Sequence, residues 1–170
     1  MQPRCEEGER IVAESASTAA GIARRVDHMA FAVADLERAL AAYAMLGGEH
    51  VFTRQRPQAG YEIGYVMVGQ ETLITLLHPT GATGPIREFL NTRGEGLHHV
   101  ALEVDDLTRV VATLRANRVE VGEIKADPGE RKEVYVPAGA LLVPMVELIE
   151  WEPAMRVSPR ERVARMAARG

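Results

Sequence analysis

Two segments of this chain closely repeat one another. The segment VDHMAFAVADLERAL begins at Val26, and the segment LHHVALEVDDLTRVV begins at Leu97. Superposing them aligns His28 with His99 at an offset of 71 residues, from 28 to 99. Such internal similarity predicts a chain built from two copies of one supersecondary unit.

Each copy predicts the same order of elements. An apolar run predicts a strand, and the apolar residues that follow have helical spacing. Asp35 and Asp106 stand where the strand ends and the helix begins, so we expect both to cap helices. Pro85–Thr92 reads as a short helix between the copies. Extended segments follow each helix, at 49–55, 61–69 and 72–79 in the first copy and at 119–125, 132–139 and 141–151 in the second.

These elements predict an α+β fold in which two tandem βαβββ modules pack together around a concave cavity. Neither four-stranded sheet could bury a face alone, so the halves must cover one another. The arginine-rich C-terminal segment is expected to hold a helix that is solvated or packed in a dimer. We expect an N-terminal extension at 1–24, one domain at 25–152 (module one 25–80, linker 81–95, module two 96–152) and a basic C-terminal extension at 153–170.

Composition narrows the class of protein. A chain of 170 residues that is 46% hydrophobic suits one domain with a sizeable core. A net charge of −4 disfavours a nucleic-acid or anionic-membrane surface. The single cysteine excludes an internal disulfide, and no apolar run approaches the length of a membrane span. The opening segment lacks the apolar run of a secretory signal, so we expect a cytoplasmic protein.

The repeated histidines are candidate metal ligands. A lone strand histidine is more often a hydrogen-bonded core residue, but symmetry should bring His28 and His99 together across the cavity. His98 has the opposite strand parity and should face away. Glu147 stands in the apolar strand segment PMVELIE, where module one has Thr75. Two imidazoles and a carboxylate suit a divalent metal, so we predict a site formed by His28, His99 and Glu147.

The motifs resemble a known family. The segment LLHPTGATGPIREFLNTRGEGLHHVALEVDDL and the final MVELIE are similar to methylmalonyl-CoA epimerases, within the vicinal oxygen chelate (glyoxalase/bleomycin-resistance/dioxygenase) superfamily. The resemblance implies a metal-dependent isomerase or epimerase that enolises a small acyl substrate, such as a methylmalonyl-CoA-like thioester. It implies the same three ligands and a divalent ion: Co²⁺, Mn²⁺, Ni²⁺, Zn²⁺ or Fe²⁺. We also expect a homodimer.

The resemblance gives Glu147 a second role, as one of two catalytic bases. The fourth ligand of the family, a glutamine or glutamate, falls where this chain has Thr75. A threonine hydroxyl is a poor, neutral ligand, so the metal should be more open here than in the epimerases.

The second catalytic base of the family is missing from the position where the resemblance places it. By resemblance it falls at Ile63, which cannot accept a proton. Glu62 is adjacent but would need a bulge to reach the cavity. Tyr61 and Tyr65 share the strand parity of Ile63 and are expected to line the cavity with Thr75, and the phenol of Tyr65 is a candidate base if its pKa is lowered.

Two further questions stay open at this level. The segment ADPGERKEV replaces the family's glycine-rich loop, and its neighbourhood holds Lys125, Arg131 and Lys132, which could meet phosphates but are expected to face solvent.

Two alternative functions are a non-haem Fe(II) dioxygenase that uses the two histidines and the glutamate, and a metal-free ligand-binding or resistance protein.

Overall fold

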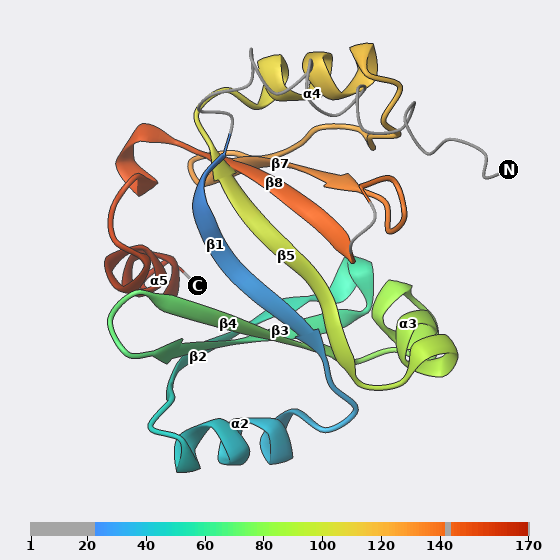
Figure 1. The fold of residues 1–170 in the computed structure, drawn as a ribbon. Coiled ribbons are helices and arrows are strands. Elements are labelled where there is room, and N and C mark those ends of the chain that lie inside the picture. The colour runs from blue at the N-terminus through green and yellow to red at the C-terminus, as the bar shows by residue number, and fades with distance from the viewer. Residues whose placement is uncertain (1–22, 142–143, 170) are drawn as a thin grey trace, which may run out of the picture.

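The computed structural model describes residues 23–141 and 144–169 (Figure 1). The predicted extension at 1–24 therefore lies almost entirely outside the described residues. Helix α3 (Pro85–Arg93) joins two βαβββ modules, which confirms the α+β fold and the predicted order of elements. Module one comprises β1 (Ala23–Ala32), α2 (Leu36–Met45), β2 (Glu49–Arg56), the 3₁₀ turn η1 (Pro57–Ala59), β3 (Tyr61–Val68) and β4 (Thr72–Pro79). Module two comprises β5 (Gly96–Val104), α4 (Leu107–Ala116), β6 (Lys125–Asp127), β7 (Arg131–Val136) and β8 (Met145–Trp151).

The strands of both modules form one eight-stranded sheet. Its order is β2-β3-β4-β1-β5-β8-β7-β6, with the two first strands, β1 and β5, antiparallel at the centre. Each central strand pairs in parallel with the last strand of its own module, β1 with β4 and β5 with β8. Figure 1 shows the sheet curling into a half-barrel, with α2 and α4 on its outer faces. The symmetric pairing places the first strand of each module beside the concave cavity.

The helices are capped and packed as the sequence predicts. The Asp35 carboxylate accepts a hydrogen bond from the Arg38 amide at 3.0 Å, and the Asp106 carboxylate accepts one from the Arg109 amide at 2.9 Å. Apolar side chains of α2 and α4 each cover a separate core cluster on the outer side of their module. None of the helices in the described part of the chain has the length and apolar character needed to cross a membrane.

One predicted strand is wrong. Residues 119–124 have no regular structure, and β6 is confined to Lys125–Asp127. The chain leaves α4 through Arg118, whose φ of 60° is unusual for a residue other than glycine. It then touches β7 through one backbone hydrogen bond, from the Gly122 amide to the Tyr135 carbonyl at 2.9 Å.

The C-terminal helix contradicts the expectation of a solvated or dimer-packing extension. After β8 the chain forms a 3₁₀ turn, η2 (Pro153–Met155), and then α5 (Pro159–Ala167), which lies against the same chain (Figure 1). Val163 and Met166 are 0% and 2% exposed and belong to the core cluster on the concave side. Arg162, also on α5, is 1% exposed. The expectation fails because carboxylates of β1 and β5 pair with this arginine, and a pattern along the chain cannot show such partners.

Candidate metal centre

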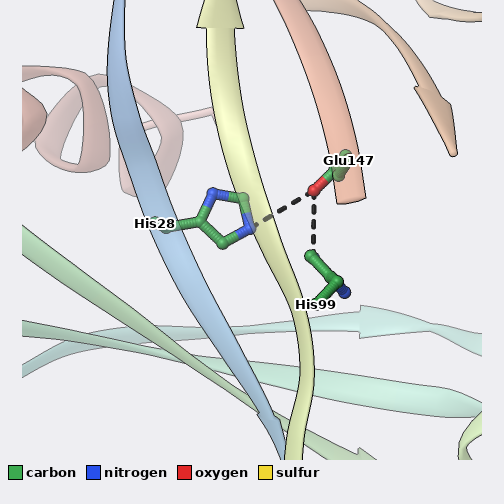
Figure 2. A group of neighbouring side chains, drawn as sticks. All are labelled: His28, His99 and Glu147. Carbon is green, nitrogen blue, oxygen red and sulfur yellow. Dashed lines mark ion pairs between the residues drawn. The ribbon is translucent and has the colours of Figure 1, made fainter. Parts of the chain in front are cut away.

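Three side chains from three neighbouring strands meet in the cavity: His28 of β1, His99 of β5 and Glu147 of β8 (Figure 2). Their candidate ligand atoms all lie within 4.8 Å of one another. The carboxylate oxygen Oε2 of Glu147 is 3.4 Å from Nε2 of His28 and 3.0 Å from Nε2 of His99. The structure therefore brings together the three residues that the sequence singles out.

Strand register explains this convergence. Ala101 of β5 stands opposite His28 on one side and opposite Glu147 on the other. His99 lies two residues before Ala101 and so points to the same face. Because the side chain of Ala101 is only a methyl group, the longer side chains of His28 on β1 and Glu147 on β8 can approach each other above it.

The charges of the three groups compensate one another. Burial alone would raise the pKa of the Glu147 carboxyl, but the neighbouring imidazoles of His28 and His99 hold this pKa well below its usual range. Burial alone would lower the pKa of His28, but hydrogen bonds to Asp27 and Glu147 raise it to about 9. The two shifts favour a protonated His28 beside an ionised Glu147, whose Oε2 lies 3.4 Å from Nε2 of the imidazole.

The donor atoms are better arranged to bind a metal ion than to form hydrogen bonds with one another. Nε2 of His99 is buried and has no hydrogen-bond partner among the described residues, although Oε2 of Glu147 is only 3.0 Å away. The hydroxyl of Thr75, on the cavity wall, is buried and without a partner in the same part of the chain. Buried polar atoms are rarely left unpaired, and an unpaired ring nitrogen beside a carboxylate suits joint coordination of a cation.

Each histidine has a partner for its other ring nitrogen. Nδ1 of His28 is 2.9 Å from a carboxylate oxygen of Asp27, and Nδ1 of His99 is 2.8 Å from Nδ1 of His98. The prediction that His98 faces away is therefore wrong. Its ring packs on Phe89 of α3, with centroids 4.8 Å apart, and still reaches its neighbour at the cavity. Burial and the neighbouring His99 lower the pKa of His98 to about 4, so its ring is neutral.

Glu147 has one more partner, which the sequence does not predict. The phenol of Tyr135 donates a hydrogen bond of 3.1 Å to Oε1 of Glu147. Burial, and then the charge of Glu147, hold the pKa of this phenol well above its usual range, so it stays a donor. Only the register of β7 against β8, which sets Tyr135 opposite Glu147, reveals this partner.

The site opens into a cavity of about 540 Å³. Tyr61, Ile63, Tyr65 and Thr75 of module one all line it. Glu62 is not among the lining residues, because β3 runs without a bulge along β4 and turns this side chain outward, where its carboxylate accepts a hydrogen bond from the Gln55 amide.

Tyr65 is placed in the cavity but is a poor base. Its ring stacks on Phe52, with centroids 4.4 Å apart, and burial raises the pKa of its phenol. This shift is opposite in direction to the one that a catalytic base would need. Neither Glu62 nor Tyr65 therefore has the properties expected of the second base.

The opposite wall carries charged groups from β6 and β7. Arg131 does not face solvent as predicted; its side chain is 11% exposed, and its Nε lies 2.7 Å from a carboxylate oxygen of Glu133. Burial and the charge of Glu147 raise the pKa of Glu133, with Arg131 opposing them. Lys125 also lines the cavity, whereas the Lys132 ammonium donates to Glu150 at 3.5 Å, and the Lys132 side chain is 42% exposed.

Comparisons with known proteins agree with this architecture. The sequence model of the Glyoxalase/Bleomycin resistance protein/Dioxygenase superfamily matches residues 27–136. The chain is 37% identical over 99 residues to the mitochondrial methylmalonyl-CoA epimerase of Bos taurus, covering 57% of this chain and 56% of that one. It is 41% identical over 86 residues to the ethylmalonyl-CoA/methylmalonyl-CoA epimerase of Cereibacter sphaeroides, covering 49% of this chain and 63% of that one. The chain thus spans little more than half the length of these curated relatives.

A solved structure is also similar. The crystal structure of methylmalonyl-CoA epimerase from Mycobacterium tuberculosis superposes with a TM-score of 0.72 at 26% identity, covering 80% of this chain and 93% of that one. The family match extends from the strand of His28 to the strand of Tyr135, and so includes most of both modules. This chain belongs to the Glyoxalase/Bleomycin resistance protein/Dioxygenase superfamily.

Proposed function

We propose that this protein is a divalent-metal-dependent epimerase that moves the proton on the carbon alpha to a thioester carbonyl, in a malonyl-type acyl substrate. The observation that carries the proposal is the convergence of His28, His99 and Glu147 inside one cavity. The relatives named methylmalonyl-CoA epimerases support the choice of reaction and of substrate class.

The two imidazoles and the carboxylate would hold the ion, and their donor set suits Co²⁺, Mn²⁺, Ni²⁺, Zn²⁺ or Fe²⁺. A bound divalent ion supplies Lewis-acid stabilisation of the negative charge that develops on a carbonyl oxygen. The proton on the neighbouring carbon then becomes acidic enough for a carboxylate to remove.

Proton removal is assigned to Glu147. Its lowered pKa keeps it ionised, and its oxygen Oε1 is oriented by the phenol of Tyr135. The pKa of Glu133, which lines the same cavity, is raised by burial and by the charge of Glu147. Two carboxyl groups with oppositely shifted pKa values are a recurring arrangement for a base and an acid, so Glu133 is assigned as the group that returns a proton.

Three cationic side chains stand among the acidic groups of the cavity and are suited to the anionic groups of a substrate. Arg56 and Lys125 come from the two edge strands, β2 and β6, and Arg131 comes from β7, beside β6. The guanidinium of Arg131 is less exposed than that of Arg56, and Glu133 at Nε and Glu130 at Nη1 hold it so that Nη2 is left for a substrate carboxylate. The other two cations are more exposed and are suited to phosphates of a coenzyme A tail.

Hydrogen exchange tests this proposal most directly. Protein loaded with Co²⁺ or Mn²⁺ is incubated with methylmalonyl-CoA in D₂O, and the signal of the proton on the alpha carbon is followed by NMR. We expect rapid loss of this signal with the native protein and with a Glu62→Gln variant, whose side chain faces outward. Glu147→Gln should abolish the exchange. No exchange in native protein with metal bound would contradict the proposal.

A second candidate is favoured by one observation. By the resemblance, Thr75 stands where epimerases have a fourth ligand. The described residues thus provide two histidines and one carboxylate, as in non-haem Fe(II) oxygenases. Oxygen uptake by Fe²⁺-loaded protein in the presence of a catechol or a keto acid would support this reading. Uptake that does not exceed that of the Glu147→Gln variant would exclude it.

The homodimer and the cytoplasmic location stay predictions from sequence. Light scattering of the purified protein checks the first: a mass close to twice the 18.6 kDa of one chain is expected. Microscopy of a tagged full-length protein checks the second.

A further inference from the structure

The most buried basic side chain in the described part of the chain belongs to the C-terminal helix. Arg162 is 1% exposed, and its guanidinium stacks over the ring of Trp151 with Cζ 4.2 Å from the ring centroid. Its Nε donates to the carbonyl of Met155 at 2.9 Å. A buried guanidinium is costly unless its donors are paired, so its partners indicate why the chain keeps it.

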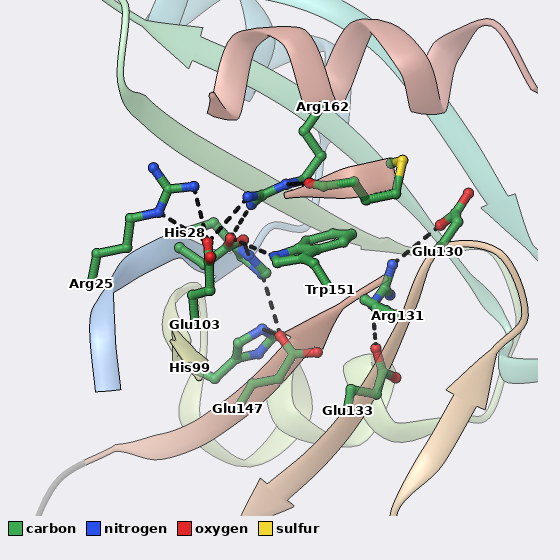
Figure 3. A network of polar contacts seen from close by, with 12 residues as sticks. Arg25, His28, His99, Glu103, Glu130, Arg131, Glu133, Glu147, Trp151 and Arg162 are labelled. Carbon is green, nitrogen blue, oxygen red and sulfur yellow. Dashed lines mark hydrogen bonds and ion pairs between the residues drawn. The ribbon is translucent and has the colours of Figure 1, made fainter. Parts of the chain in front are cut away.

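Two of these partners are carboxylates on the central strands (Figure 3). Nη2 of Arg162 donates to Glu103 of β5 at 3.1 Å, and Arg25 of β1 holds the same Glu103 oxygen from the other side, with Nε 3.0 Å away. Nη1 of Arg162 donates to Oδ2 of Asp27 on β1. The guanidinium therefore ties α5 to both central strands of the sheet.

Asp27 uses its two oxygens for different partners. Oδ2 accepts from Arg162 and from the indole N–H of Trp151 at 2.9 Å. Oδ1 is left to accept the Nδ1–H of His28, also at 2.9 Å. A proton fixed on Nδ1 leaves Nε2 of His28, which faces Glu147, as the ring nitrogen that can bind a metal.

We propose that Arg162 is a positioning residue for the metal centre, which acts through Asp27 to fix the orientation and the tautomer of His28. The inference rests on the metal site proposed above and adds the C-terminal helix to it. Arg162 lies beyond residues 27–136, which match the superfamily model. The helix is thereby a part of this chain's site that the family match does not include.

The arrangement makes a specific prediction for an amide at position 27. Two donors, from Arg162 and Trp151, converge on Oδ2 of Asp27, so the amide of Asp27→Asn would place its oxygen there. Its NH₂ group would then face Nδ1 of His28 and require that nitrogen to accept. The proton would move to Nε2, which could no longer bind a metal, although the shape of the side chain is unchanged.

The test compares Co²⁺ binding by visible absorption in full-length native protein and in Arg162→Gln, Arg162→Lys and Asp27→Asn. The matched control is Arg165→Gln, on the same helix, where Arg165 is 41% exposed and pairs with Glu161. We expect Arg162→Gln and Asp27→Asn to weaken Co²⁺ binding by about 10- to 100-fold, the usual effect of losing a partner of a ligand. Arg162→Lys should recover part of the loss, and Arg165→Gln should bind as the native protein does.

Two further readouts distinguish a positioning role of Arg162 from a role in the stability of the fold alone. The first is the Co²⁺ absorption band, which should change in shape in Arg162→Gln but not in Arg165→Gln. The second is the ¹⁵N NMR spectrum of the Zn²⁺-loaded protein, in which His28 should show Nδ1 protonated and lose this signature in Asp27→Asn. Near-UV circular dichroism establishes that each variant is folded.

The outcomes are distinguishable. If the native protein binds no Co²⁺, the proposed function itself is contradicted. A folded Arg162→Gln with native Co²⁺ affinity and an unchanged absorption band would overturn the positioning role while leaving the metal site intact. If Arg162→Gln does not fold, Asp27→Asn decides: unaltered affinity overturns the inference, and loss of affinity with a changed His28 signature supports it.

Discussion

The phenol of Tyr135 donates a hydrogen bond of 3.1 Å to Oε1 of Glu147, on the neighbouring strand. The other oxygen, Oε2, is left facing the Nε2 atoms of both histidines. The two oxygens of this carboxylate therefore have separate partners, and the carboxylate plane is held in one orientation. A ligand held in this way is preorganised for metal binding, since it need not reorient when the metal binds.

Tyr135→Phe removes the donor and keeps the ring. We expect Co²⁺ affinity to fall by about 10-fold, because the freed carboxylate can rotate away from the histidines. Isothermal titration calorimetry of native and variant protein measures this. Tyr61→Phe is the matched control, since Tyr61 lines the same cavity without a hydrogen bond to the three ligands among the described residues, and equal losses in both variants would contradict the role of Tyr135.

Metal affinity should depend on pH through His28. Its pKa is raised from 6.5 to about 9 in the metal-free protein, so a metal must displace a proton. Apparent Co²⁺ affinity should therefore rise by up to about tenfold per pH unit, and stop rising above the raised pKa. Titrations at a series of pH values check this, and an affinity that is constant with pH would contradict it.

The same shift predicts how the metal-free protein loses stability. Because the folded state holds the His28 proton more tightly than the unfolded state, this contribution is complete below pH 6.5 and is lost as pH rises through about 9. The free energy of unfolding, measured in guanidinium chloride with a chelator present, should fall over this range. His28→Gln should remove that part of the pH dependence.

Glu133→Gln separates proton transfer from metal binding. General acid–base groups contribute about 10²- to 10⁴-fold, so we expect the rate of epimerisation to fall by at least the lower figure. Co²⁺ affinity should change little, since Glu133 is not one of the three ligand side chains. Circular dichroism of the two epimers follows the reaction, and Glu62→Gln serves as the outward-facing control.

Thr75→Gln should add a fourth ligand. The Thr75 hydroxyl is buried in the cavity wall without a partner among the described residues, and a longer amide side chain would carry its oxygen toward the three ligands. We expect Co²⁺ to bind about tenfold more tightly and its visible absorption to weaken as coordination increases. Thr72→Gln, at an exposed strand end, should bind as native, and equal behaviour of the two variants would be evidence against an open position beside Thr75.

Met166→Ala tests how α5 contributes to the fold. Met166 is 2% exposed in the core, so truncation should cost about 2–5 kcal/mol of unfolding free energy. Ala164→Ser, at an exposed position of the same helix, should change stability by no more than about 0.5 kcal/mol. Chemical denaturation of both variants measures the difference, and similar values would mean that the helix is solvated after all.

Much of the fold was determined by local patterns in the sequence. Strand and helix periodicities are properties of adjacent residues, and each aspartate cap acts on an amide three residues away. The repeat then added one long-range fact, the symmetry that relates His28 to His99. Together with Glu147 in an apolar strand, these features were enough to name the three residues that meet in the cavity.

The partners of those three residues were decided only by the tertiary structure. Tyr135 and Glu133 reach the site because β7 lies beside β8 in one register, and a shift of one residue would turn both side chains outward. Arg162 reaches Asp27 across 135 positions of the chain, through a helix whose sequence looks solvated. Such contacts depend on how distant elements pack, and no periodicity within a segment encodes them.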